Sequence, residues 1–156
     1  MTARLDSVAK YICEESGWRV SNLALQKLAY LAQVDHFARF GLPLIDTTFE
    51  AWDLGPVSPD LYHKVKIFGA RPVRDVFYDA RNFREDDERR RTLKRICKKY
   101  LGKRPGELVE ISHWDFGAWA KKYEPNFRGI PITDDDIKYE IRNRERHSDL
   151  WERING

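Results

Sequence analysis

The stretch that decides the fold runs from Leu25 to Gly69 and reads LQKLAYLAQVDHFARFGLPLIDTTFEAWDLGPVSPDLYHKVKIFG. Its first part, up to Phe40, is apolar on nearly every face of a helix, and such a helix is usually central and buried. Ser21 or Asn22 can cap its start, and Gly41 can end it in a left-handed conformation. We therefore predict that this helix is the centre of the fold.

The rest of the stretch changes character twice. Residues 49–54 have strand-like composition around Trp52, and the Gly-Pro pair at 55–56 makes a bend because proline disfavours helix at the preceding residue. The Ser-Pro-Asp triplet at 58–60 supplies a capping hydroxyl, a proline at the first helical position and an acid near the helix N-terminus. A short strand, a turn and a second helix are expected here.

Apolar residues at helical spacing predict helices on both sides of this stretch. One covers the N-terminal residues up to Gly17, and another runs from about Asp86 to Gly102. Pro105 opens a short helix, and residues 112–131 read as an aromatic loop. Residues 71–83 are consistent either with a strand that pairs with residues 49–54 or with a loop.

A last helix is predicted to begin at Thr133, which forms a capping box with Asp136, and to reach toward Trp151. No linker, repeat or low-complexity tract interrupts the chain. The expected fold is mainly α: a single compact multi-helix domain, residues 1–156, around a central apolar helix, with at most a small two- or three-stranded β element.

Composition narrows the class of protein. The chain has 42% hydrophobic and 34% charged residues and a net charge of +3, which is typical of a globular domain and does not demand a nucleic-acid partner. No apolar run has membrane-spanning length and no signal peptide is recognisable, so a cytoplasmic protein is expected. Cys13 and Cys97 belong to no paired motif and read as buried reduced thiols.

No pattern for catalysis or for metal binding is recognisable. The four histidines lack metal-ligand spacing, and neither a nucleophile elbow nor a phosphate-binding loop is present. The three acids at 134–136 are better explained as first-turn residues of a helix than as cation ligands. We therefore expect no enzyme activity, no cofactor and no metal.

The densest charge lies in Arg81–Arg104, with eleven basic residues against four acids. Such a segment can bind nucleic acid through phosphate contacts, which gives an alternative function as a nucleic-acid-binding regulator. Residues 85–87 are acidic and lie four positions ahead of the three arginines at 89–91, the spacing of ion pairs on a helix. A solvated helix with internal ion pairs is the favoured interpretation.

Polar residues occur among the apolar ones of the central helix: Gln26, Lys27, Tyr30, Gln33 and Asp35. They are expected either to form an internal hydrogen-bond network or to face a partner, and the internal network is favoured. Among the tryptophans, Trp52 and Trp119 are expected in the core. Trp151 lies in a charged C-terminal segment and is expected to be exposed, with the composition of a binding hot spot.

Residues 25–33, LQKLAYLAQ, resemble the LQKLLYFAQ helix of the Panacea antitoxin domain, also called the SocA-like or phage-associated GepA-type domain. Ser112 stands where the family usually has Thr. The resemblance covers about residues 5–142 and leaves 143–156 as a C-terminal helical tail. The further segments that carry it are GLPL at 41–44, FEAW at 49–52, GPVSP at 55–59, ISH at 111–113, Trp119 and residues 132–141.

The resemblance implies a mainly helical, non-enzymatic antitoxin whose partner is a cognate protein toxin, neutralised by direct binding. One branch of the family presents its toxin to a cellular protease, so sequestration and protease delivery both stay open. Nucleic acid is a less favoured partner, no membrane is expected, and homo-oligomerisation is left open. The candidate partner-binding residues are Trp52, Val57, Tyr62, His113, Trp114, Trp119 and Trp151.

Overall fold

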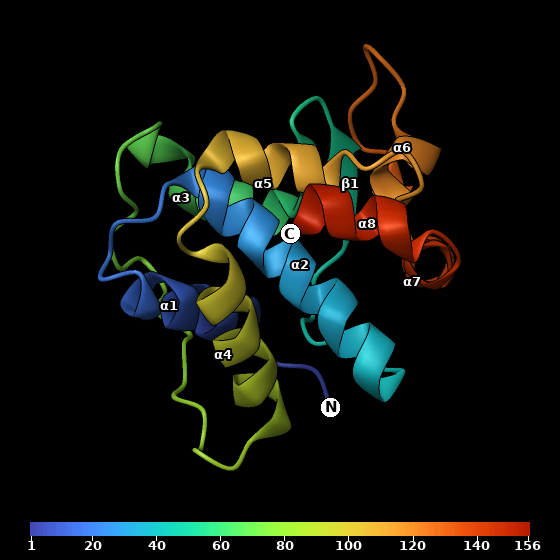
Figure 1. Cartoon of the computed structure of the whole chain (residues 1–156). Helices are drawn as coiled ribbons and strands as arrows, with labels where there is room; N and C mark the ends of the chain where they lie inside the picture. Colours follow the sequence, from blue (N-terminus) through green and yellow to red (C-terminus); the bar gives the residue numbers. More distant parts are fainter.

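The computed structural model describes residues 1–156 and confirms a mainly α fold with one small sheet (Figure 1). The elements in chain order are α1 (Leu5–Glu15), α2 (Asn22–Phe40), β1 (Phe49–Trp52), β2 (Gly55–Val57), α3 (Pro59–Val65), the 3-10 turn η1 (Lys66–Phe68), α4 (Glu88–Tyr100), α5 (Pro105–Ser112), α6 (Ala118–Lys122), β3 (Pro131–Ile132), α7 (Asp134–Arg146) and α8 (Ser148–Asn155).

Helix α2 is the centre of the fold, as predicted. It packs against α1, α4, α5, α7 and strand β2, and Figure 1 shows it crossing the middle of the molecule with α4 on one side and α8 on the other. The Ser21 hydroxyl accepts a hydrogen bond from the Ala24 amide at 3.3 Å and so caps its start. Gly41 ends it with a φ of 68°, a conformation that favours glycine.

The sheet has the order β2-β1-β3, and both pairs are antiparallel. Its third strand comes from residues 131–132, which no local pattern indicated. Residues 71–83 form the loop alternative instead. They contribute no strand, because Val73 and Phe77 insert into the core while the Asp79 amide bonds to the Asp6 carboxylate of α1 at 3.0 Å.

The C-terminal residues form two helices rather than one. The capping box of Thr133 and Asp136 begins α7 as predicted, but the helix is interrupted at His147 and α8 is a separate helix that also packs against α5. Trp151 and Asn155 are buried, so this segment packs against the rest of the chain. The predicted aromatic loop likewise contains the short helix α6.

Two further properties concern the chain as a whole. Cys13 and Cys97 are free and buried, as predicted, and burial raises the pKa of each thiol to about 12. None of the helices is both long enough and apolar enough to cross a lipid bilayer.

Candidate protein-interaction surface

The polar residues of α2 fasten the neighbouring segments to the central helix. The Gln26 amide donates to the Ser58 carbonyl at 3.1 Å and accepts from the Ser58 amide at 2.8 Å, which fixes the start of α3. Gln33 accepts from the amides of Leu44 and Ile45 at 2.8 and 2.9 Å. The predicted internal network is therefore confirmed for these residues.

Lys27 holds the β1–β2 hairpin from inside. Its side chain is fully buried, and its ammonium donates to the Pro56 carbonyl at 2.8 Å. It forms no ion pair with a carboxylate, and burial lowers its pKa to about 7. Gly55 sits against it with a φ of 108°, where a Cβ would lie 2.7 Å from Ser112 Oγ and 3.2 Å from Lys27 Nζ. Only glycine fits there.

A buried carboxylate joins α2 to the C-terminal helices. Glu140 accepts from the Tyr30 hydroxyl at 2.8 Å, from the Ala118 amide at 3.0 Å and from Arg144 Nη2 at 2.5 Å. Burial, and next the charge of Glu140, raises the pKa of Tyr30 well above its ordinary value, so the phenol stays a donor. These contacts position α6 against α2.

Three rings at α5 and α6 stack on one another next to the hairpin: His113 directly follows α5, Trp119 lies in α6 and Tyr123 directly follows α6. His113 and Trp119 are parallel with ring centroids 3.7 Å apart, and Trp119 stacks on Tyr123 at 4.5 Å. The Trp119 indole donates to the Trp52 carbonyl at 2.6 Å. Burial, and then the nearby charge of Lys27, lowers the pKa of His113, so its ring is neutral at neutral pH.

The hairpin and the loop after α6 complete the surface. The Trp52 ring meets Tyr62 edge-on at 4.9 Å and is covered by the Arg128 guanidinium at 4.1 Å. The Tyr123 hydroxyl donates to Asp53 at 2.6 Å. Figure 1 shows the β1–β2 turn and the loop after α6 at the same end of the molecule. All members of this aromatic surface are partly or fully exposed; it comprises Trp52, Leu54, Tyr62, His113, Trp119, Tyr123 and Arg128.

The structure brings four of the predicted site residues together on this surface: Trp52, Tyr62, His113 and Trp119. The expectation that Trp52 and Trp119 are core residues is met only in part: both side chains are partly exposed, and Trp119 packs against the core. Tyr123 lies in the segment 112–131, for which the sequence predicts an aromatic loop without a role for this residue. No local signal could identify Arg128, since it reaches Trp52 only through the fold of that loop.

The other three predicted site residues lie in the core. Val57, Trp114 and Trp151 are 6%, 6% and 8% exposed. The expectation that Trp151 is exposed is wrong, because Trp114 packs on its ring at 5.2 Å and the Arg144 guanidinium covers it at 3.8 Å. Exposure of these side chains to a partner would require the C-terminal helices to move.

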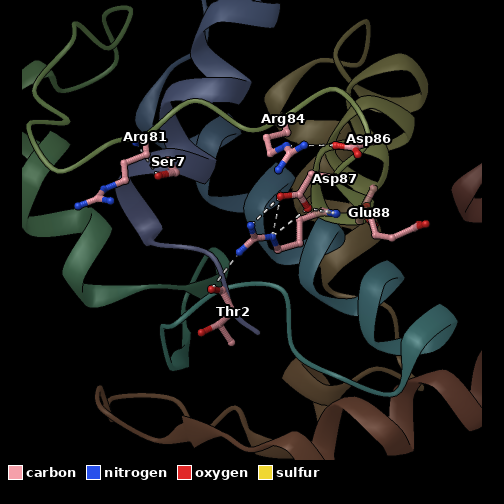
Figure 2. Close-up of polar contacts among 9 residues, drawn as sticks. Thr2, Ser7, Arg81, Arg84, Asp86, Asp87 and Glu88 are labelled. Carbon is pink, nitrogen blue, oxygen red and sulfur yellow. Dashed lines mark hydrogen bonds and ion pairs between the residues drawn. The ribbon is translucent and has the colours of Figure 1, made fainter.

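The arginines at the start of α4 are held in local ion pairs. Arg89 binds Asp87 with an N–O distance of 2.6 Å and also donates to the Thr2 carbonyl; Figure 2 shows Asp87 and Thr2 on opposite sides of the side chain to which dashed lines join them. Arg91 pairs with Glu88 at 2.8 Å. The predicted ion pairs between residues four positions apart are wrong, because α4 begins only at Glu88 and Asp87 is its N-cap. The favoured solvated-helix interpretation fits these pairs, whereas nucleic-acid binding stays an untested prediction.

No group of three or more histidine, cysteine, aspartate or glutamate side chains is arranged to hold a metal ion. His36 bonds to Thr92 at 2.7 Å and His113 is stacked on Trp119, so neither histidine is paired with a carboxylate. The arrangement at the aromatic surface provides contact area and fixed hydrogen-bonding groups rather than a reactive pair.

Comparison with known proteins identifies the family. The sequence model of the "Antitoxin SocA-like, Panacea domain" family matches residues 25–120, which begin inside α2 and end inside α6. The chain belongs to this family. A curated relative, antitoxin SocA of Caulobacter vibrioides (strain NA1000 / CB15N), is 29% identical over 109 residues. The match covers 64% of this chain and 58% of that relative's length. No solved structure matches significantly.

Proposed function

We propose that this member of the SocA-like Panacea family is an antitoxin that neutralises a cognate protein toxin by binding it through the aromatic surface. The observation that carries the proposal is a set of partly exposed rings inside the family-matched region, namely Trp52, Tyr62, His113 and Trp119, which are held by ring–ring contacts and by the hydrogen bond from Trp119 to Trp52. The binding requires no chemistry on the toxin and takes place in the cytoplasm.

The physical basis is pre-organisation. Tryptophan, tyrosine and arginine dominate the binding energy of protein interfaces, and they contribute most when little side-chain freedom is lost on binding. Trp119 is held between two stacked rings and by its indole hydrogen bond, and Trp52 contacts Tyr62 edge-on and has Arg128 over its ring. These side chains already have the restricted positions that a bound state needs.

Two modes of neutralisation are consistent with such a surface. In sequestration the toxin stays bound and stable, whereas in protease delivery the toxin is degraded faster when the antitoxin is present. The name of the Caulobacter relative supports the antitoxin role in general and does not separate the two modes.

The proposal is tested by co-expression with the short open reading frame beside this gene. The neighbour alone is expected to arrest growth, and co-expression of the intact chain is expected to restore it. The toxin's half-life after a block of translation then distinguishes sequestration, with an unchanged half-life, from delivery, with a shortened one. A neighbour that is harmless alone, or growth arrest that persists on co-expression, refutes the antitoxin function.

A further inference from the structure

A second concave site lies away from the aromatic surface, between α2, α4 and the C-terminal helices. It is a pocket of about 510 Å³. Its lining comes from the C-terminal half of α2, from α4, and from α7 and α8. Figure 1 shows α4 and α8 on opposite sides of α2. We call it the basic pocket because its charged lining consists of Arg39, Arg95, Lys98, Lys99, Arg144 and a single carboxylate, Asp35.

The single carboxylate does not neutralise the cationic side chains. Asp35 accepts from Arg95 Nη2 at 2.8 Å and from Arg39 Nε at 3.3 Å, so two guanidinium groups share one negative charge. Lys98 and Lys99 are exposed and form no ion pair with any carboxylate of the chain. The pocket therefore keeps a strong positive potential, which attracts anions.

The arginines of the basic pocket also retain unused donors. Arg144 is fixed by Glu140 and by its stacking on Trp151, yet its Nε is buried without a hydrogen-bond acceptor. The Nε of Arg95 is likewise buried without an acceptor. Buried N–H groups are rarely left unpaired, and the Arg95 side chain, which is 36% exposed, can turn to pair its N–H groups with an anion. Both orphaned groups belong to this one pocket.

The size and shape of the basic pocket restrict the anion. A volume of about 510 Å³ is within the usual range for small-molecule sites, and the floor is formed by buried side chains such as Leu31 and Ile96. A long nucleic-acid backbone requires a strip of charge rather than a single hollow. Lysine ammonium groups combined with guanidinium forks are the usual recognition set for phosphate.

We propose that the basic pocket binds a compact polyphosphate anion, with the charge of pyrophosphate or of the phosphate chain of a nucleoside di- or triphosphate. The bound anion contacts Lys98 and Lys99 from α4 and the guanidinium groups of Arg95 and Arg144. It thereby joins α4 to α7, and α7 lies outside the family-matched residues 25–120. This site is separate from the aromatic surface and does not depend on the antitoxin role.

The test is isothermal titration of the full chain with sodium pyrophosphate and, separately, with ATP. We expect saturable binding at one site per chain by both probes. Lys98→Gln/Lys99→Gln is expected to weaken binding by about tenfold or more, because two phosphate-facing charges are lost. Both side chains are exposed, so this variant is expected to fold, which circular dichroism checks.

Arg91→Gln/Lys94→Gln is the matched control. It removes the same charge from the same helix at exposed positions outside the pocket, so its affinity for pyrophosphate is expected to stay within about threefold of wild type. The proposal is overturned if neither probe binds more tightly than sulfate at equal ionic strength. It is also overturned if both double variants weaken binding equally, or if duplex DNA or poly-glutamate displaces pyrophosphate at lower concentration than ATP does.

Discussion

Replacement of Lys27 by Met gives the sharpest prediction about stability. Lys27 is fully buried, its ammonium meets only the Pro56 carbonyl, and burial lowers its pKa to about 7. Methionine has similar length and carries no charge, so it removes the cost of burying an ammonium while it fills most of the same space.

The sign and size follow from proton linkage. A base whose pKa is lower in the folded chain binds fewer protons when folded, so the free energy of unfolding rises with pH between the two pKa values. For Lys27 this window runs from about 7 to the ordinary value of 10.5. One pKa unit corresponds to about 1.4 kcal/mol, so Lys27 contributes a rise of about 1 kcal/mol between pH 7 and pH 8.

The assay is urea unfolding at pH 7 and at pH 8 for wild type, Lys27→Met and the exposed-site control Lys94→Met. His113 has a lowered pKa and is neutral across this interval, so it adds little to the slope. Wild type and Lys94→Met are expected to gain about 1 kcal/mol more than Lys27→Met. If all three chains respond equally to pH, Lys27 titrates normally and the buried-ammonium interpretation is refuted.

Two further predictions concern packing and the buried carboxylate. Gly55→Ala is expected to lower the free energy of unfolding by about 3 kcal/mol, whereas Gly41→Ala, which also has positive φ but open space around it, is expected to lower it by about 1 kcal/mol. Adding Ser112→Ala should recover part of the stability that Gly55→Ala loses. Equal urea midpoints for the two glycine variants would contradict this. Glu140→Ala is expected to lower the free energy of unfolding by about 3–5 kcal/mol, because it leaves buried donors unpaired. The control Glu145→Ala, at an exposed position of the same helix, should change it by less than about 0.5 kcal/mol. Similar thermal melts for both variants would count against a stabilising role of the Glu140 carboxylate.

Local sequence signals predicted the parts of this fold that depend on local physics. The apolar central helix with its cap and its glycine terminator, and the proline-started α3, are each specified by neighbouring residues. Contacts between distant segments were not predictable in the same way. The pairing of Phe49 with Ile132 joins residues far apart in the chain and involves a strand of only two residues.

The sequence indicated some residues of the candidate surface but not which side chains are exposed. Aromatic composition and family motifs indicated Trp52 and Trp119, but their exposure depends on how the hairpin and α6 meet. Trp151 lies among charged residues in the sequence and was therefore expected at the surface. It is buried because the helix is interrupted at His147 and α8 packs against α5 and α7, an interruption that the charged pattern does not reveal.

The most direct measurement is the affinity of the purified toxin for wild type, Tyr62→Ala and Tyr78→Ala. Tyr62 belongs to the aromatic surface, whereas Tyr78 is 88% exposed on the loop that packs against α1. The Tyr62→Ala variant is expected to bind about thirtyfold more weakly, as for a hot spot of about 2 kcal/mol, and Tyr78→Ala to bind as wild type does. Wild-type affinity in Tyr62→Ala together with weakened binding in Tyr78→Ala would contradict toxin recognition by the aromatic surface.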